Sequence, residues 1–317
     1  MKRVLLTGAS GFVGRSLCAT LAQSGYEVRA ALRTAGVTVP GAAQHVCVGD
    51  IGARTDWQQA LSGLDLVIHA AARAHVVNDP KSNSDLYTAI NTDGTACLAR
   101  AAAAAGVRRF VFLSSLKVNG EEVENHAYTV ADEPRPRDIY GMSKWLAEKA
   151  LIDIAARTNM AVAVVRAPLV YGPGVRANFL RLMQWVDAQR PLPLGAIRNR
   201  RSLISVWNLC DLVVNLLENP ASTHGTWLAS DASDLSTPEL VRRIAAAMHK
   251  RALLVPVPVT LLRMVGRLTG RSGEVRRLCG SLAVDVSQTS AVLGWVPPLS
   301  VDEGLSRTVA WYMAEGR

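Results

Sequence analysis

Strand-like and helix-like segments alternate from the first residues of this 317-residue chain, and this alternation restricts the possible folds more than any other feature. Parallel strands are joined by helices that cover both faces of a sheet, so the pattern predicts an α/β fold built on a doubly wound parallel sheet. Apolar runs typical of buried strands lie at 4–6, 28–32, 45–48, 66–69, 109–113 and 161–166, and helical spacing is found at 12–24, 85–105 and 139–158.

The composition of the sequence changes after Pro168, where proline, glycine and tryptophan become frequent and the helical stretches become shorter. We therefore predict that residues 1–167 form the sheet domain and that 168–317 form mainly a smaller C-terminal lobe, partly interleaved with the first. Apolar residues make up 49% of the chain and aromatic residues only 5%, a balance that suits a sheet covered by helices better than a β-sandwich.

The charge of the chain and its cysteine content indicate which binding partners and which cellular compartment to expect. The formal net charge of +9 favours an anionic partner, and a basic solvated surface explains it equally well. The densest basic cluster, Arg198, Arg200 and Arg201, has no aromatic residues interleaved with it, so nucleic acid is not expected. The five cysteines are widely spaced and the six histidines show no ligand spacing, so we expect a cytoplasmic protein without a disulfide framework or a metal site.

Two stretches bear on contact with membranes. The apolar run at the N-terminus stops at Gly8, too early for a secretory signal, and no run of about 18 apolar residues predicts a transmembrane segment. Residues 259–268 are apolar but include Arg263 and Arg267. Such a segment forms either an amphipathic helix on a membrane surface or, more often, a cap over the substrate or a subunit contact.

Three glycines follow the first predicted strand, at the point where the first predicted helix begins. Gly8 allows a tight turn, Gly11 lets a pyrophosphate approach the backbone, and Gly14 lets the helix pack on the strand. The helix N-terminus adds free N–H groups and a partial positive charge. The turn therefore predicts a Rossmann-type dinucleotide site, with the G-x-x-G-x-x-G spacing of short-chain dehydrogenases.

The choice between NAD and NADP depends on the residues after the second strand. An acidic side chain there binds the ribose 2′-hydroxyl of NAD, whereas an arginine accommodates the 2′-phosphate of NADP. No acid is present, and Arg33 lies just past the strand. This favours NADP or loose selectivity, and the alternative interpretation of Arg33 is an ordinary surface residue.

The candidate catalytic residues are Ser115, Tyr140 and Lys144. On a helix, Tyr140 and Lys144 share one face, and a lysine ammonium close by is expected to favour the phenolate and lower the tyrosine pKa. Ser115 ends the fifth predicted strand, at the carboxyl edge where ligands bind in doubly wound sheets. Together they predict proton removal from a hydroxyl while hydride leaves the same carbon.

Further segments share their spacing with one enzyme family: 69–72, Asn91 with 94–95, 113–115, 140–144 and 166–173. With them, the chain resembles extended short-chain dehydrogenases of the NAD-dependent epimerase/dehydratase family over almost its full length. The resemblance implies NAD or NADP as cofactor and a homodimer. The cofactor contacts that it implies are Gly8, Gly11, Phe12, Val13, Gly14, Arg33, Asp50, Ile51, Ala70, Ala71, Ala72, Asn91, Tyr140, Lys144, Ala167, Pro168 and Leu169.

Residues 118–121 and 194–202 are similar to bacterial enzymes that act at C4 of UDP-N-acetylhexosamines. This resemblance implies a UDP-quinovosamine 4-dehydrogenase or 4-reductase, with a UDP-GlcNAc 4-epimerase that retains NAD as the alternative. A non-catalytic NADP-sensing scaffold is a remote alternative, because such proteins usually lack the tyrosine or the lysine. The substrate contacts implied are Ser115, Asn119, Asn178, Arg201 and Arg277, and for Asn119 a turn-forming role is equally open.

Overall fold

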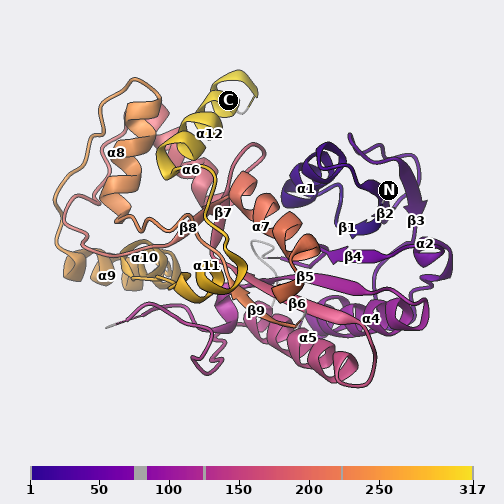
Figure 1. Cartoon of the computed structure of the whole chain (residues 1–317). Coiled ribbons are helices and arrows are strands. Elements are labelled where there is room, and N and C mark those ends of the chain that lie inside the picture. Colours follow the sequence, from indigo (N-terminus) through magenta and orange to yellow (C-terminus); the bar gives the residue numbers. More distant parts are fainter. Residues whose placement is uncertain (1, 75–83, 124–125, 223, 316–317) are drawn as a thin grey trace.

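The computed structural model describes residues 2–74, 84–123, 126–222 and 224–315. Its central element is a parallel sheet of seven strands in the order β3-β2-β1-β4-β5-β6-β9, which confirms the predicted doubly wound α/β fold (Figure 1). The strands are β1 (Arg3–Thr7), β2 (Glu27–Leu32), β3 (Gln44–Cys47), β4 (Leu66–His69), β5 (Arg109–Ser115), β6 (Ala161–Ala167) and β9 (Gly225–Leu228).

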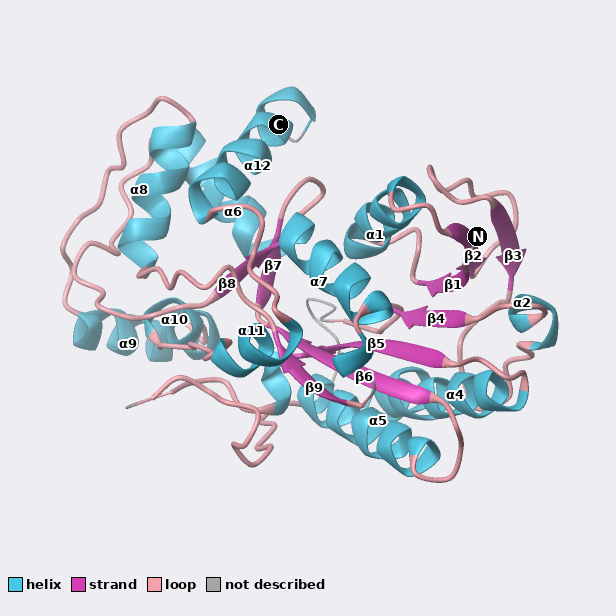
Figure 2. Ribbon diagram, viewed as in Figure 1, coloured by secondary structure: helices cyan, strands magenta, loops and turns pink. Residues whose placement is uncertain are grey.

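Helices cover both faces of this sheet (Figure 2). On one face, α1 (Phe12–Gln23) packs beside α7 (Val206–Glu218) over an aliphatic core. On the other face, α4 (Gly94–Ala104) and α5 (Ile139–Ala155) cover a second core, with the short α2 (Gln58–Leu61) beside them. The central strands β1, β4, β5 and β6 are buried on both faces, which explains why they read as continuous apolar runs in the sequence, whereas the edge strand β3 is mostly exposed.

The helix predicted over 85–105 is interrupted in the structure. It consists of α3 (Ser84–Tyr87), a π-helical segment (Thr88–Asp93) and α4. Asn91 in the π-helical segment is buried and hydrogen-bonds to Ser143 of α5, a partner that helical spacing along the sequence cannot reveal. Single π-helical turns are frequent at functional sites.

The remaining elements form a lobe around a third apolar core. Its two-stranded sheet pairs β7 (Leu169–Tyr171) with β8 (Leu203–Ser205) in parallel. The division of the chain at residue 167 stays a prediction. Two elements from beyond that residue, α7 and β9, belong to the layers of the main sheet. The other helices are α6 (Ala177–Asp187), α8 (Thr237–Ala247), α9 (Val259–Leu268), α10 (Ser272–Cys279), α11 (Ser287–Leu293) and α12 (Val301–Glu315).

The strand register brings the carboxyl ends of the central strands to one edge of the sheet. Thr7 of β1 is paired with His69 of β4, and Ser115 of β5 with Ala167 of β6. Polar side chains at these ends therefore lie next to one another although they are far apart in the sequence. No helix in the described part of the chain is long and apolar enough to cross a bilayer.

Candidate active site

The glycine turn between β1 and α1 is shaped by two close backbone approaches. Gly8 has a φ of +70°, and a Cβ there would lie 2.7 Å from the Ala71 amide nitrogen at the end of β4. A Cβ on Gly14 would lie 2.0 Å from the Gly8 carbonyl oxygen. Only glycine fits at these two positions, and the tight turn leads directly into the N-terminus of α1, whose free N–H groups fit the pyrophosphate of a dinucleotide.

The other predicted cofactor residues surround this turn. Arg33 and Asp50 are exposed just past β2 and β3. Ile51 packs on Gly94 of α4, where a Cβ would lie 2.5 Å from the isoleucine Cγ2 atom. Their contact with a cofactor stays a prediction. The remaining predicted cofactor residues lie in four places. They are found at the start of α1 (Phe12, Val13), after β4 (Ala70, Ala71, Ala72), in the π-helical segment (Asn91) and where β6 leads into β7 (Ala167, Pro168, Leu169).

A buried histidine joins the strand ends beneath the turn. The ring of His69 contacts Thr7 Oγ1 through Nδ1 at 2.7 Å and Thr95 Oγ1 through Nε2 at 2.9 Å. Burial, and then the charge of Lys144, lowers the pKa of His69 to about 3. The imidazole is therefore neutral at physiological pH and serves as a fixed link between β1, β4 and α4. The residues around His69 in the sequence do not predict this role.

Asn91 ties the loop after β4 to α5. Its side-chain oxygen accepts from the Arg73 backbone at 2.8 Å, and its nitrogen donates to Ser143 Oγ at 2.9 Å. Ser143 in turn donates to the Tyr140 carbonyl at 2.8 Å. The first turn of α5 is thus held by a residue of the π-helical segment.

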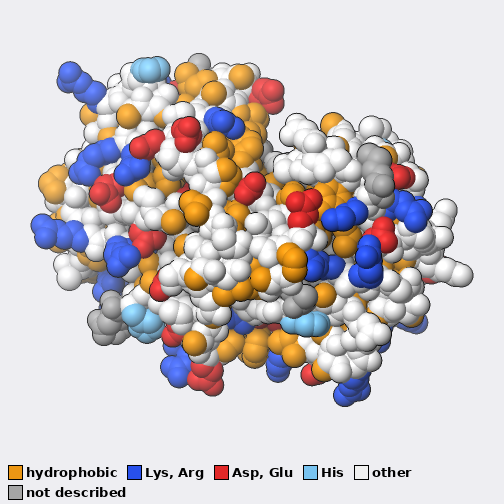
Figure 3. Space-filling model, in the orientation of Figure 1, with side chains coloured by type: hydrophobic (Ala, Val, Ile, Leu, Met, Phe, Trp, Pro, Cys, Tyr) orange, Lys and Arg blue, Asp and Glu red, His pale blue; other side chains and the backbone are white. Residues whose placement is uncertain are grey.

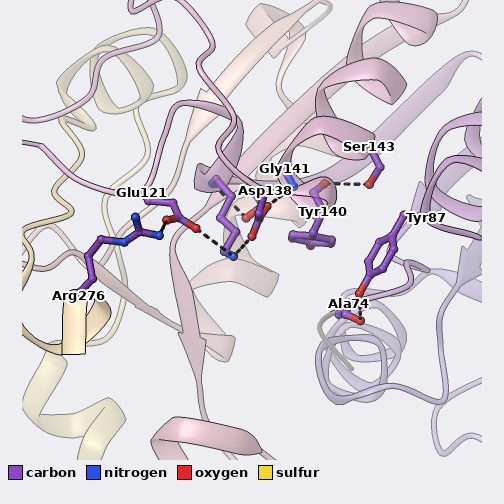
Figure 4. Close-up of polar contacts among 10 residues, drawn as sticks. Ala74, Tyr87, Glu121, Asp138, Tyr140, Gly141, Ser143 and Arg276 are labelled. Carbon is purple, nitrogen blue, oxygen red and sulfur yellow. Dashed lines mark hydrogen bonds and ion pairs between the residues drawn. The ribbon is translucent and has the colours of Figure 1, made fainter. Parts of the chain in front are cut away.

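The structure brings Ser115, Tyr140 and Lys144 together. Tyr140 lies in the first turn of α5 (Figure 4). Ser115, at the end of β5, hydrogen-bonds to the Tyr140 hydroxyl. Lys144 is buried one turn further on, and its Nζ donates to the Leu113 carbonyl at 2.7 Å.

Burial dominates the proton affinities of this group. It raises the pKa of Tyr140 to about 12, with a further increase from Asp138, while the hydrogen bond from Ser115 acts in the opposite direction. Burial also lowers the pKa of Lys144 to about 7, opposed by Glu148. The expectation that Lys144 leaves Tyr140 with a lowered pKa is wrong for this structure, because loss of water destabilises the phenolate and the ammonium alike.

A chain of charged side chains connects α10 to the N-terminus of α5 (Figure 4). Arg276 of α10 pairs with Glu121, whose other oxygen lies 3.9 Å from the Lys117 Nζ atom. Lys117 pairs with Asp138, which caps α5 by accepting from the Gly141 amide at 2.7 Å. The sequence does not predict this chain of charges, because Arg276 and Glu121 are 155 positions apart.

A buried ion pair joins α5 to β6 beside the site. Arg166 of β6 and Glu148 of α5 are both almost fully buried, with 2.6 Å between Arg166 Nη2 and Glu148 Oε2. The same carboxylate accepts from Ser114, and Arg166 also donates to the Asn119 side-chain oxygen at 3.0 Å. Asn119 is 1% exposed, so its oxygen serves the structure rather than a substrate, and only its amide nitrogen lacks a partner among the described residues.

The predicted substrate residues are only partly brought together. Arg201 donates to the carbonyl oxygens of Arg277 at 2.7 Å and Gly280 at 3.0 Å, so its guanidinium lies at the C-terminal end of α10. Asn178 is exposed in the first turn of α6. A hollow of about 550 Å³ lies between residues 119–137 and α10, and its lining includes Asn119, Glu121 and Arg276. No cluster of three or more potential metal ligands is present among the described residues.

Comparison with known proteins agrees with this geometry. The model of the NAD dependent epimerase/dehydratase family matches residues 4–228. A UDP-glucose 4-epimerase of Vibrio cholerae is 43% identical over 98% of this chain and 96% of its own length. An N-acetyl-alpha-D-glucosaminyl-diphospho-ditrans,octacis-undecaprenol 4-epimerase of Escherichia coli O157:H7 is 28% identical over 97% of this chain and 94% of its own.

Solved structures show the same fold. MoeE5 in complex with UDP-glucuronic acid and NAD superposes with a TM-score of 0.79 at 27% identity, covering 98% of this chain and 99% of that one. A UDP-glucuronic acid 4-epimerase of Bacillus cereus in complex with NAD reaches 0.79 at 21% identity, covering 99% and 100%. The family model spans more than half of the chain and the Vibrio relative covers nearly all of it, so the chain belongs to the NAD-dependent epimerase/dehydratase family and is an NAD-dependent enzyme.

Proposed function

We propose that this enzyme is a 4-epimerase of a UDP-hexose. The observation that carries the proposal is the hydrogen-bonded pair of Ser115 and Tyr140, at the same sheet edge as the glycine turn. The 4-epimerase names of the Vibrio and Escherichia relatives support the choice of reaction. The 4-reductase favoured by the narrower sequence resemblance becomes the second candidate.

Each proposed role follows from a position in the site. Bound NAD supplies the reversible acceptance of a hydride from C4 of the sugar. The Tyr140 phenolate oxygen takes the proton of the C4 hydroxyl and returns it at the end of the cycle, and Ser115 holds the same sugar oxygen. Lys144, one turn away on α5, carries a positive charge when protonated, and that charge opposes the increase in the Tyr140 pKa that burial causes. The glycine turn binds the pyrophosphate, and Arg201 and Arg277 bind the substrate diphosphate.

Chromatography of the sugar nucleotides tests the reaction directly. Purified enzyme is incubated with UDP-glucose, UDP-GlcNAc or UDP-quinovosamine, with and without added NAD⁺ or NADP⁺. Formation of the C4 epimer without net growth of the reduced-nicotinamide absorbance supports the 4-epimerase. Tyr140→Phe should abolish it, whereas Tyr26→Phe, which removes a phenol bonded to Glu218 far from this edge, should not.

A 4-reductase or 4-dehydrogenase is the second candidate, because Arg33 is exposed past β2 where an acid would select NAD. Net oxidation of UDP-quinovosamine with NADP⁺, without any epimer from UDP-glucose or UDP-GlcNAc, would support this candidate and overturn the first. Arg33→Ala should then weaken NADP⁺ binding more than NAD⁺ binding. If no substrate turns over and Tyr140→Phe binds cofactor like the parent, the scaffold alternative gains support.

The homodimer implied by the resemblance is also a proposal. Light scattering of the purified chain checks it.

A further inference from the structure

Helix α9 carries an apolar stripe on its outer side. Leu261, Met264, Val265 and Leu268 are exposed, Leu268 by 80%, and their spacing places them along one side of the helix. The opposite side, which includes Val259 and Leu262, packs on the core of the lobe. The outer stripe is therefore additional to the face that holds the helix in place.

The stripe is also where exposed apolar side chains concentrate. Of sixteen large apolar side chains that are exposed in the described part of the chain, seven lie between residues 253 and 278. Scattered single residues of this kind are normal on a protein surface, whereas a contiguous group marks an interaction site.

Basic side chains accompany this apolar group. Residues 250–280 contain seven lysines and arginines and one acidic residue, Glu274. Two of the seven, Lys250 and Arg276, pair with Asp187 and Glu121 from other parts of the chain. Arg263, Arg267 and Arg271 are exposed and form no ion pair with any described residue. Figure 3 shows basic and apolar side chains next to one another at the end of the molecule where α9 and α10 lie.

The helix is rigidly mounted. A Cβ on Gly266 would lie 2.7 Å from the Val275 Cγ2 atom, so the glycine allows α10 to pack closely on α9. The Arg271 amide donates to the Gly266 carbonyl at 2.7 Å and closes the turn between the two helices. The stripe therefore lies on a fixed surface of the enzyme.

We propose that α9 docks this enzyme on an anionic lipid bilayer. An amphipathic helix with an exposed apolar stripe and basic flanks inserts its apolar side among lipid headgroups, while the arginines bind anionic lipid. A second copy of the chain fits less well, because a two-fold contact would set this basic surface against itself. The proposal does not rest on the reaction proposed above, since binding to lipid needs no turnover.

Co-sedimentation of the full-length enzyme with vesicles tests the proposal. Vesicles of phosphatidylcholine with added phosphatidylglycerol should bind the enzyme, and vesicles of phosphatidylcholine alone should bind it far more weakly. High salt should weaken the binding. Replacing Leu268 and Met264 together by Gln should lower the partition coefficient about tenfold or more. Replacing Arg263 and Arg267 together by Gln should weaken the preference for the anionic lipid, and adding Arg271→Gln should weaken it further.

Matched controls come from other surfaces of the chain. Val296 and Val292 are exposed by 73% and 45%, and replacing both by Gln should leave vesicle binding unchanged. The same holds for Arg100 and Arg157, exposed residues near α4 and α5. The proposal is overturned if the parent binds neither vesicle, or if the controls lose binding as much as the α9 variants. It is also overturned if Leu268→Gln with Met264→Gln converts an oligomer into a smaller species, because a second copy then covers the stripe.

Discussion

The sheet edge around Tyr140 and the surface formed by α9 and α10 differ in how they hold their polar groups. At the sheet edge, the side chains of His69, Asn91 and Glu148 are almost fully buried and bonded to neighbours on other elements. On α9, Arg263 and Arg267 point into solvent beside exposed apolar side chains. Hydride and proton transfer need reacting groups fixed to a fraction of an ångström, whereas attraction to a charged surface acts over several ångströms.

The largest expected effect lies at the sheet edge. Tyr140→Phe removes the proposed proton acceptor and should reduce kcat by about 10²–10⁴-fold. The free energy of unfolding in urea should change little, since the ring stays in place. A variant that keeps more than half of the parent activity would remove Tyr140 from the mechanism.

A buried and an exposed ion pair make the next contrast. Arg166→Leu leaves the buried Glu148 carboxylate without its partner and should cost about 3–5 kcal/mol of unfolding free energy. Arg200→Leu breaks a pair with Asp234 in which the arginine side chain is 72% exposed, and should cost less than about 1 kcal/mol. Urea denaturation of both variants compares the two regions directly, and equal losses would contradict the contrast.

Two glycines give a smaller contrast of the same kind. Gly14→Ala puts a Cβ 2.0 Å from the Gly8 carbonyl oxygen, so we expect a loss of about 1–3 kcal/mol in stability together with weaker NAD binding. Gly273→Ala in α10 meets no atom within 4 Å, and should stabilise the fold by at most about 1 kcal/mol. Thermal melts with and without NAD measure both effects. A lower melting temperature for Gly273→Ala would contradict the open space around that position.

The smallest effect concerns pH. The charge of Asp138 raises the pKa of Tyr140, so Asp138→Asn should lower that pKa while the amide still caps α5. The limb on which kcat/KM rises with pH should therefore move to lower pH, by on the order of half a unit. Asp65→Asn, at an ion pair with Arg108 on the opposite edge of the sheet, should leave the profile in place. Movement toward higher pH would contradict the assignment.

The parts predicted from sequence are those that short segments encode. The strand at 66–69 is found at the predicted residues, and the helix that begins at Phe12 ends at Gln23, one residue early. The glycine turn was also predictable, because a tight turn and a close helix leave local traces. Ser115, Tyr140 and Lys144 were predicted as a group, and the structure places them together, while their catalytic roles stay predictions.

The features that were missed depend on contacts between distant segments. The π-helical turn forms around Asn91, whose partners are Arg73 and Ser143. The high pKa of Tyr140 follows from burial, which no spacing of residues reveals. Glu148 reads as an ordinary helix residue until β6 places Arg166 beside it.

The position of β9 has a consequence for how the chain is made. Residues 225–228 pair with 163–166 of β6, so a strand from late in the chain completes a sheet whose other six strands come from the first 167 residues. A ribosome releases β6 long before β9, and the nascent chain meanwhile presents an unpaired strand edge, which is a template for aggregation. We therefore expect refolding after dilution from denaturant to be limited by the late pairing of β9 with β6.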